Sequence, residues 1–227
     1  MNLLFMDVET TGLNPIVHEV IEICLVETLP DGTIVQRFDS KITPKGPVDP
    51  EAAEVNGYTP EKWADAPASY VVWDKISRVF GACTCIPEET QDQSHAEWCR
   101  AHPKNKLTPW GWNVSFDLGF IKPYIFFEMS YHLEDVRSLC RPFLPWDKKV
   151  SLGDAWTILC SKDKPLYAEG EPHSAVKDVL AEIDLYQLVI ATWKTLGEEQ
   201  TRRHDTNRLA VKAVERWGSG LADSKAC

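Results

Sequence analysis

Residues 1–13, MNLLFMDVETTGL, combine an apolar run with two carboxylates and a turn. Residues 3–6 predict a buried strand, which continues into Asp7 and Glu9 with one apolar residue between them. Because side chains at i and i+2 of a strand point to the same face, the two carboxylates stand side by side. Like charges so placed repel each other unless a cation lies between them. A strand end that reaches solvent would also explain two acidic residues, so the rest of the chain has to decide.

The composition is that of a globular protein. The 227 residues are 44% hydrophobic and 26% charged, enough for one domain with additional elements. A net charge of -10 argues against a broad basic face for nucleic acid, but it leaves room for a nuclease whose local cations are bound metals. No apolar run approaches the roughly 18 residues that span a membrane, and seven cysteines without a secretion signal predict reduced thiols. We therefore expect a soluble, cytoplasmic protein without a membrane partner.

The order of predicted elements indicates an α/β domain around one mixed sheet. After the opening strand, a hairpin is predicted with its turn at Pro30-Asp31-Gly32. The strands after the opening one are predicted over residues 18–29, 33–42, 107–112 and 132–136. The main helices are predicted over residues 69–80, 116–129, 152–160 and 174–196.

Two further carboxylates stand at the starts of predicted helices, Asp117 in NVSFD and Asp178 in HSAVKD. Four acidic groups from separate elements could build an oxygen-rich site for two Mg²⁺ or Mn²⁺ ions. Such a pair of ions, about 3.5–4 Å apart, clamps an in-line attack on phosphorus. On a regular helix His173 would lie about 140° from Asp178, so we expect it in the loop after Pro172. Close to a helix N-terminus its imidazole would be neutral, which suits a general base, although a surface histidine is the alternative.

Three motifs, DVETTGL, NVSFD and HSAVKD, occur in this order between residues 2 and 196. Together they resemble the motifs of the DEDDh exonucleases, DnaQ-like nucleases of the proofreading-subunit type. The resemblance implies a ribonuclease-H-like fold, with a mixed central sheet flanked by helices. It implies two Mg²⁺ or Mn²⁺ ions held by four metal ligands, with a histidine as general base. The implied ligands are Asp7, Glu9, Asp117 and Asp178, and the implied base is His173.

The resemblance also implies how the 3′-terminal nucleotide binds. The turn formed by Thr10, Thr11, Gly12 and Leu13 would contact it, with the backbone near Thr10 close to the sugar hydroxyl and Leu13 against the base. Asn113 and Phe120 would shape the pocket. Trp112 stands where many relatives have histidine, and it either stacks on a base or packs at the end of a strand.

Residues 81–106 interrupt the pattern and are interpreted as an insertion. The insertion contains five soft ligands, enough for a tetrahedral zinc site, although their spacing is irregular. Ordinary reduced surface residues are the alternative. The candidate zinc ligands are Cys83, Cys85, His95, Cys99 and His102.

These observations predict an exonuclease domain over residues 1–196 and a helical tail over residues 197–227. The tail would contact nucleic acid or a protein partner, or would simply be solvated. We expect a metal-dependent 3′-5′ exonuclease that releases 5′-nucleotides from single-stranded DNA, in repair or proofreading, alone or beside a polymerase or another replication partner. A 3′-5′ exoribonuclease of the same fold, trimming RNA ends or short oligoribonucleotides, stays open because both sugars carry the terminal hydroxyl. A binding module without catalysis is a third possibility, and the sequence indicates no oligomeric state.

Overall fold

The computed structural model describes residues 1–81, 106–125, 129–160, 165–167 and 171–222. The chain divides into two units, Met1–Gln187 and Leu188–Cys227. The candidate zinc ligands lie outside the described residues. Within the described residues, none of the helices combines the length and the apolar character needed to cross a bilayer.

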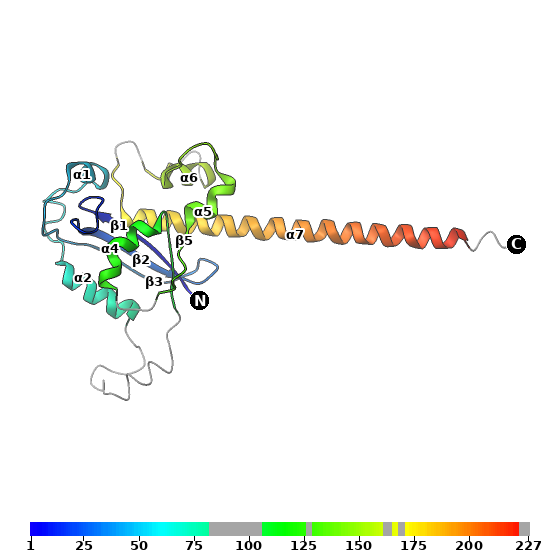
Figure 1. Ribbon diagram of the computed structural model, residues 1–227, viewed down its shortest axis with the longest axis horizontal. Helices are drawn as coiled ribbons and strands as arrows, with labels where there is room; N and C mark the ends of the chain where they lie inside the picture. Colours follow the sequence, from blue (N-terminus) through cyan, green and yellow to red (C-terminus); the bar gives the residue numbers. More distant parts are fainter. Residues whose placement is uncertain (82–105, 126–128, 161–164, 168–170, 223–227) are drawn as a thin grey trace, which may run out of the picture. The chain divides into compact units, whose positions relative to one another are not determined.

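The first unit is built on a five-stranded mixed sheet with strand order β3-β2-β1-β4-β5 (Figure 1). The three N-terminal strands pair in antiparallel fashion, and the last two strands run parallel to β1. The predicted α/β fold with a mixed central sheet is therefore confirmed. The strands are β1 (Leu3–Thr10), β2 (Val20–Thr28), β3 (Ile34–Lys41), β4 (Thr108–Gly111) and β5 (Glu134–Asp135).

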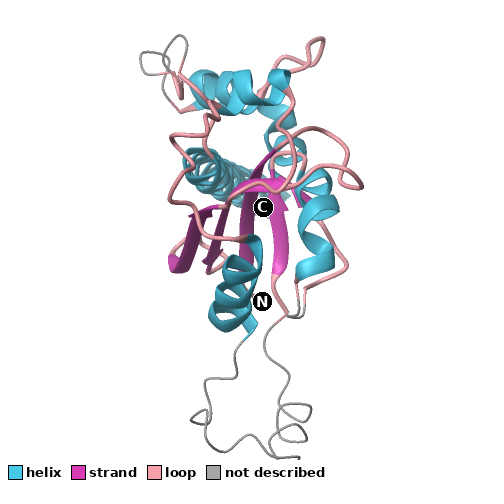
Figure 2. Cartoon of the chain, turned by 90° about the vertical axis from the view of Figure 1, so that its left-hand side faces the viewer, coloured by secondary structure: helices cyan, strands magenta, loops and turns pink. Residues whose placement is uncertain are grey.

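Helices surround this sheet (Figure 2). They are α1 (Pro50–Asn56), α2 (Ser69–Ile76), α4 (Val114–Ile121), α5 (Val136–Cys140), α6 (Leu152–Leu159) and α7 (Ala175–Ala222). Short helical turns follow three of them, a π turn at Ser77–Gly81 and 3-10 turns at Lys122–Tyr124 and Arg141–Phe143.

The alternation of side chains along β1 separates the core from the acidic face. Leu4, Met6 and Val8 are buried in the hydrophobic cluster that includes residues of α2 and α4. The intervening residues point the other way, because successive side chains of a strand alternate between faces. On that second face the ring of Phe5 packs edge-on against Tyr186 of α7, with ring centroids 5.5 Å apart. Asp7 and Glu9 continue this face toward the end of the strand.

Two predicted element boundaries were wrong for identifiable reasons. The helix predicted over residues 116–129 is α4, which ends at Ile121, because Pro123 lies in a separate 3-10 turn and Ile125 is extended. The strand predicted over residues 132–136 is shorter in the structure, where it is the two-residue β5. It ends at Asp135 because this residue accepts a hydrogen bond from the N–H of Arg137 and thereby caps α5.

The helix predicted to end at residue 196 continues to Ala222. Gly197 is its only glycine before residue 218, and one glycine costs a helix only about 1 kcal/mol relative to alanine. The residues that follow are mostly good helix formers, so the helix extends through this position.

Candidate active site

The end of β1 and the first turns of α7 bring three of the predicted metal ligands together. Carboxylate oxygens of Asp7, Glu9 and Asp178 all lie within 4.8 Å of one another. Tyr186 lies eight residues after Asp178 on the same side of α7, so its contact with Phe5 aligns this helix with β1. The alternation along β1 and the spacing along α7 therefore place Asp178 opposite Asp7 and Glu9.

Asp117 reaches the same region from the first turn of α4. Its Oδ1 accepts a hydrogen bond from the N–H of Val8, between the two strand carboxylates, at 3.0 Å. The side chain is buried, with only 3% of the residue exposed. The structure thus brings all four predicted carboxylates to the end of β1, with Asp117 fixed to the strand backbone.

Burial and mutual repulsion raise the pKa of each of these carboxyls. Loss of hydration is the larger cause in each case, and neighbouring carboxylates add to it. The pKa of Asp7 rises to about 7, that of Asp178 to about 8 and that of Glu9 to about 9. The pKa of Asp117 also lies well above its ordinary value. A divalent cation would relieve the repulsion and compete with these protons.

The structure adds two carboxylates that the sequence analysis missed. Glu22 on β2 pairs directly with Glu9 on the antiparallel neighbour β1 and accepts a hydrogen bond from the hydroxyl of Ser174 at 2.9 Å. Glu182 on α7 is fully buried, and its Oε1 accepts the backbone N–H of Trp112 at 2.6 Å. The spacing of four between Asp178 and Glu182 was an available signal, but the register between β1 and β2 that pairs Glu22 with Glu9 cannot be derived from the sequence pattern.

Buried oxygens without partners provide the test of whether a cation fits. Within the part of the chain that the structure describes, Oδ1 of Asp178 and Oε2 of Glu182 are buried and accept no hydrogen bond. A buried carboxylate oxygen without a donor is costly unless a proton or cation satisfies it. Asp7, Glu9 and Asp178 offer carboxylate oxygens, which are the ligands that Mg²⁺ and Mn²⁺ prefer. The donor set therefore fits hard divalent ions.

His173 lies in the loop before α7, as predicted. Its Nδ1 is 3.6 Å from Oδ2 of Asp178, and 44% of its side chain is exposed. The ring packs against Tyr167 with centroids 4.3 Å apart, and the backbone N–H donates to the carbonyl of Val55 at 3.0 Å. Partial burial lowers the pKa of His173, which favours the neutral form of the imidazole.

The turn after β1 is held by its own two threonines. The hydroxyl of Thr10 donates to the carbonyl of Gly12 at 2.7 Å, and its own carbonyl accepts a hydrogen bond from the side chain of Asn56 at 3.1 Å. Thr11 forms two hydrogen bonds with Glu19: its N–H donates to the carbonyl of Glu19 at 2.8 Å, and its hydroxyl accepts from the N–H of Glu19 at 2.9 Å. Both threonine side chains are buried, so they shape the turn.

A pocket of about 470 Å³ opens between this turn, α1 and the start of α4. Glu9 lines it, so the pocket extends up to the carboxylate cluster. Leu13, Val55 and Phe116 give it apolar walls, and 81% of the Leu13 residue is exposed. The flat aromatic face of a nucleobase fits walls of this kind.

Three predicted pocket residues lie elsewhere. Phe120 is buried in the core, and the aromatic residue of α4 that lines the pocket is Phe116, one turn earlier. Trp112 is half-buried, with its backbone N–H bound by Glu182. Asn113 adopts the left-handed conformation at φ 69° that starts α4, a conformation that asparagine tolerates better than most residues. A spacing of four separates the two phenylalanines, so the sequence could not tell which one faced the pocket.

Comparisons with known proteins agree with this arrangement. Residues 4–98 match the family RNase_T, described as Exonuclease. A stretch of 115 residues is 32% identical to the DNA polymerase III PolC-type of Bacillus cereus, covering 51% of this chain and 6% of that protein. The chain therefore spans a small part of this curated relative.

Solved structures of exonuclease I from E. coli share the fold. The zinc-bound complex with single-stranded DNA has a TM-score of 0.60 and 16% identity, covering 87% of this chain and 42% of that one. The complex with a 5cy-dT13 oligonucleotide has a TM-score of 0.58 and 18% identity, covering 92% of this chain and 45% of that one. Residues 4–98 are therefore similar in sequence to the RNase_T exonuclease family, and the chain shares the fold of the exonuclease I structures.

Proposed function

We propose that the chain is a 3′-5′ exonuclease that removes 5′-nucleotides from single-stranded DNA with two Mg²⁺ or Mn²⁺ ions. The observation that carries the proposal is the convergence of Asp7, Glu9 and Asp178 within 4.8 Å, with His173 3.6 Å from Asp178. Carboxylates from a strand and a helix, with a neutral histidine at their edge, are the groups that metal-assisted phosphodiester hydrolysis requires.

The carboxylates are proposed to hold the metal ions. Asp7 and Asp178 lie at the centre of the cluster, Glu9 faces the pocket, and Asp117 is fixed by its bond to the N–H of Val8. Bound ions of this kind lower the pKa of water and stabilise the charge that develops on the phosphoryl oxygens. The rigid strand and helix backbones hold the ligands in position before substrate arrives, which reduces the reorganisation needed during reaction.

His173 is proposed to take the proton from the attacking water. Its lowered pKa keeps it neutral and able to accept, and the contact with Tyr167 restricts its ring. The hydrogen bond from its N–H to Val55 fixes the loop to α1, which lines the pocket. The base and the pocket are therefore positioned by the same loop.

The pocket is proposed to hold the 3′-terminal nucleotide. Leu13 and Phe116 would contact the base, and Glu9 lies where the pocket meets the cluster. Such apolar contacts do not distinguish one base from another, because every base has a π-face. This is consistent with an enzyme that removes nucleotides one after another without regard to sequence.

The choice of single-stranded DNA is supported by the exonuclease I structures, which were solved with single-stranded DNA and oligonucleotides. The likeness to a PolC-type DNA polymerase supports a role in repair or proofreading and a polymerase as partner. An exoribonuclease, the alternative, would use the same pocket. Matched DNA and RNA substrates distinguish the two activities.

The test follows 5′-labelled single-stranded DNA and an RNA of the same sequence, each in Mg²⁺ and in EDTA. The proposal predicts a ladder that shortens from the 3′ end of DNA and disappears in EDTA and in Asp178→Asn. Asp184→Asn is the matched control, since Asp184 is an exposed carboxylate on the same helix. Digestion of RNA but not DNA would show that the substrate is RNA. If neither nucleic acid is digested, the proposal is overturned.

A further inference from the structure

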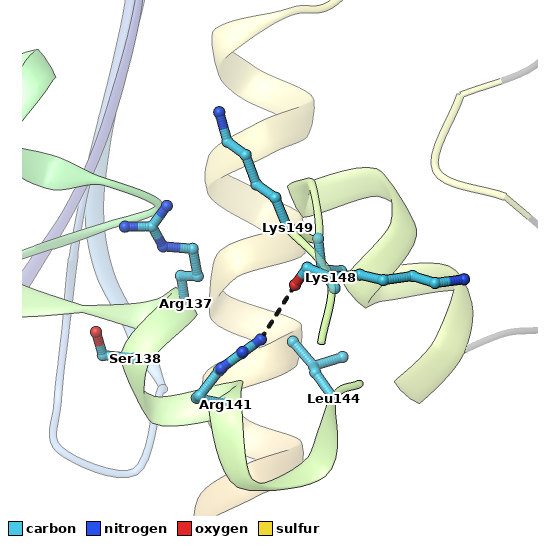
Figure 3. Close-up of a pocket in the computed structure, with 7 residues that line it drawn as sticks. Arg137, Ser138, Arg141, Leu144, Lys148 and Lys149 are labelled. Carbon is cyan, nitrogen blue, oxygen red and sulfur yellow. Dashed lines mark hydrogen bonds between the residues drawn. The ribbon is translucent and has the colours of Figure 1, made fainter. Parts of the chain in front are cut away.

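A second pocket, of about 380 Å³, lies outside the carboxylate cluster and is lined by four cationic residues. The cationic residues are Arg137, Arg141, Lys148 and Lys149, with Leu144 among the apolar lining (Figure 3). We refer to these four residues as the basic pocket. In a chain with a net charge of -10, such a local group of cations is a candidate for binding a polyanion.

The basic pocket begins at the same edge of the sheet as the carboxylates. Strands β1, β4 and β5 run parallel, so their C-terminal ends meet at one edge. β5 is the second strand from β1, which separates the two strand ends by roughly 10 Å at about 4.8 Å per strand. Arg137 follows two residues after β5 ends at Asp135.

Hydrogen bonds connect the basic pocket to the carboxylate cluster. Asp135 accepts the N–H of Asn113 at 3.3 Å and the N–H of Arg137 at 2.8 Å. Asn113 follows Trp112, whose N–H donates to the buried Glu182, four residues after Asp178 on α7. The start of α5 is therefore held in a defined position relative to the proposed catalytic residues.

The four cations differ in what they can bind. The guanidinium of Arg141 donates to the carbonyls of Pro145 at 2.9 Å and Lys148 at 3.3 Å, and also to that of Trp146. Arg141 therefore builds the wall of the pocket.

Arg137 and Lys149 are the two cations that face one side of the pocket and retain donors for a ligand. Arg137 lies 3.6 Å from the carboxylate of Asp135, with 42% of its side chain exposed. Across the described ranges, neither Lys148 nor Lys149 has a carboxylate within 4.0 Å. In Figure 3 the side chains of Arg137 and Lys149 extend toward one side of the pocket, whereas Lys148 extends away from them.

We propose that Arg137 and Lys149 bind backbone phosphates of the nucleic-acid strand upstream of its 3′ end. The proposal rests on the proposed exonuclease function and adds the path of the strand, from the carboxylates along the sheet edge to the start of α5. An arginine fork and a lysine ammonium both bind phosphate, and such contacts position a strand without reading its bases. They would offset the repulsion between an acidic protein and a polyanion.

The test measures binding of a single-stranded DNA of about 20 nucleotides in EDTA by fluorescence anisotropy over a range of salt concentrations. Arg137→Gln combined with Lys149→Gln is expected to weaken binding about tenfold at low salt. It should reduce the slope of log Kd against log salt by about 1.4, since each lost phosphate contact contributes about 0.7 on a single strand. The matched control, Lys148→Gln, removes the adjacent charge and is expected to leave binding nearly unchanged.

Hydrolysis in Mg²⁺ is measured in parallel on the long strand and on a dinucleotide, which is too short to reach from the carboxylates to α5. The double variant should lose activity on the long strand and keep activity on the dinucleotide. Equal binding by the double variant and the wild type, or an equal loss in Lys148→Gln, would overturn the proposal. If the wild type hydrolyses nothing while the double variant still loses affinity, the proposed function fails and the phosphate-binding surface stands.

Discussion

At the scale of single residues, the proposed chemistry depends on the protonation of His173. Partial burial lowers its pKa, so the neutral form that can accept a proton prevails at a lower pH than for a free histidine. Its Nδ1 is 3.6 Å from Asp178, and its ring is supported by Tyr167. A residue so placed should control the acidic side of the pH profile.

Replacing this histidine should therefore change both rate and pH dependence. His173→Gln is expected to lower kcat about 10²–10⁴-fold, the usual contribution of a general base. In the wild type, kcat/KM should rise with pH through a pKa below the ordinary histidine value, and this rise should be absent in the variant. His132→Gln, at an exposed position, is the control. An unchanged pH profile in His173→Gln would exclude His173 as the base.

The buried carboxyls predict how stability depends on pH without metal. In an unfolded chain the pKa of a carboxyl is about 4. In the folded protein the pKa values of Asp7, Asp178 and Glu9 are about 7, 8 and 9. Between these values the folded protein binds protons that the unfolded chain has released. The free energy of unfolding should therefore fall as pH rises from about 4 to about 9 in EDTA.

Bound Mg²⁺ or Mn²⁺ should remove much of this dependence, because the ions replace the protons. Thermal unfolding in EDTA and in excess Mg²⁺ across the same pH range measures both effects. Asp7→Asn should flatten the EDTA curve, since it removes one charge from the centre of the cluster. A thermal unfolding midpoint in EDTA that does not fall as the pH rises would contradict the raised pKa values.

At the scale of elements, the turn after β1 determines the shape of the pocket. A Cβ at Gly12 would lie 2.5 Å from Cε1 of His18 and 2.6 Å from Oδ2 of Asp49. The His18 ring lies 3.4 Å from the hydroxyl of Thr11 and 3.5 Å from Asp49, so it is held on two sides. An added methyl group would therefore displace the turn that carries Leu13.

Gly12→Ala should raise KM and also lower the free energy of unfolding. The overpacked turn is expected to cost about 1–3 kcal/mol of unfolding free energy, while displacement of Leu13 weakens binding of the terminal nucleotide. Gly46→Ala is the matched control, because a Cβ there would meet nothing within 4 Å. Steady-state kinetics on a short oligonucleotide and chemical denaturation separate the two effects, and an unchanged KM would show that the turn does not contact substrate.

At the scale of the whole molecule, the proposed catalytic residues and the basic pocket belong to the unit Met1–Gln187. The buried core cluster around β1 also lies within it. We therefore expect residues 1–196 to fold and to hydrolyse DNA without residues 197–227. The truncated chain is tested by circular dichroism and by kcat on a short oligonucleotide. A loss of folding or of kcat would show that the tail is part of the domain.

Several features could be predicted from the sequence because they depend on local periodicity. The alternation in residues 3–9 predicts both the buried strand and the shared face of Asp7 and Glu9. The order of strands and helices predicts a mixed sheet, and Pro172 predicts that His173 precedes the helix. The end of α4 at Ile121 could have been predicted from Pro123, but the apolar spacing across that proline suggested a longer helix.

Contacts between residues far apart in the sequence depend on how the elements pack against one another. The packing of Phe5 on Tyr186 aligns α7 so that Asp178 and Glu182 both reach β1, and the register between β1 and β2 places Glu22 opposite Glu9. The same folding brings Arg137 and Lys149 to one pocket. A sequence pattern shows which face of its own element a side chain occupies. The register between elements is set by long-range packing and hydrogen bonds. It cannot be derived from the spacing of residues within one strand or helix.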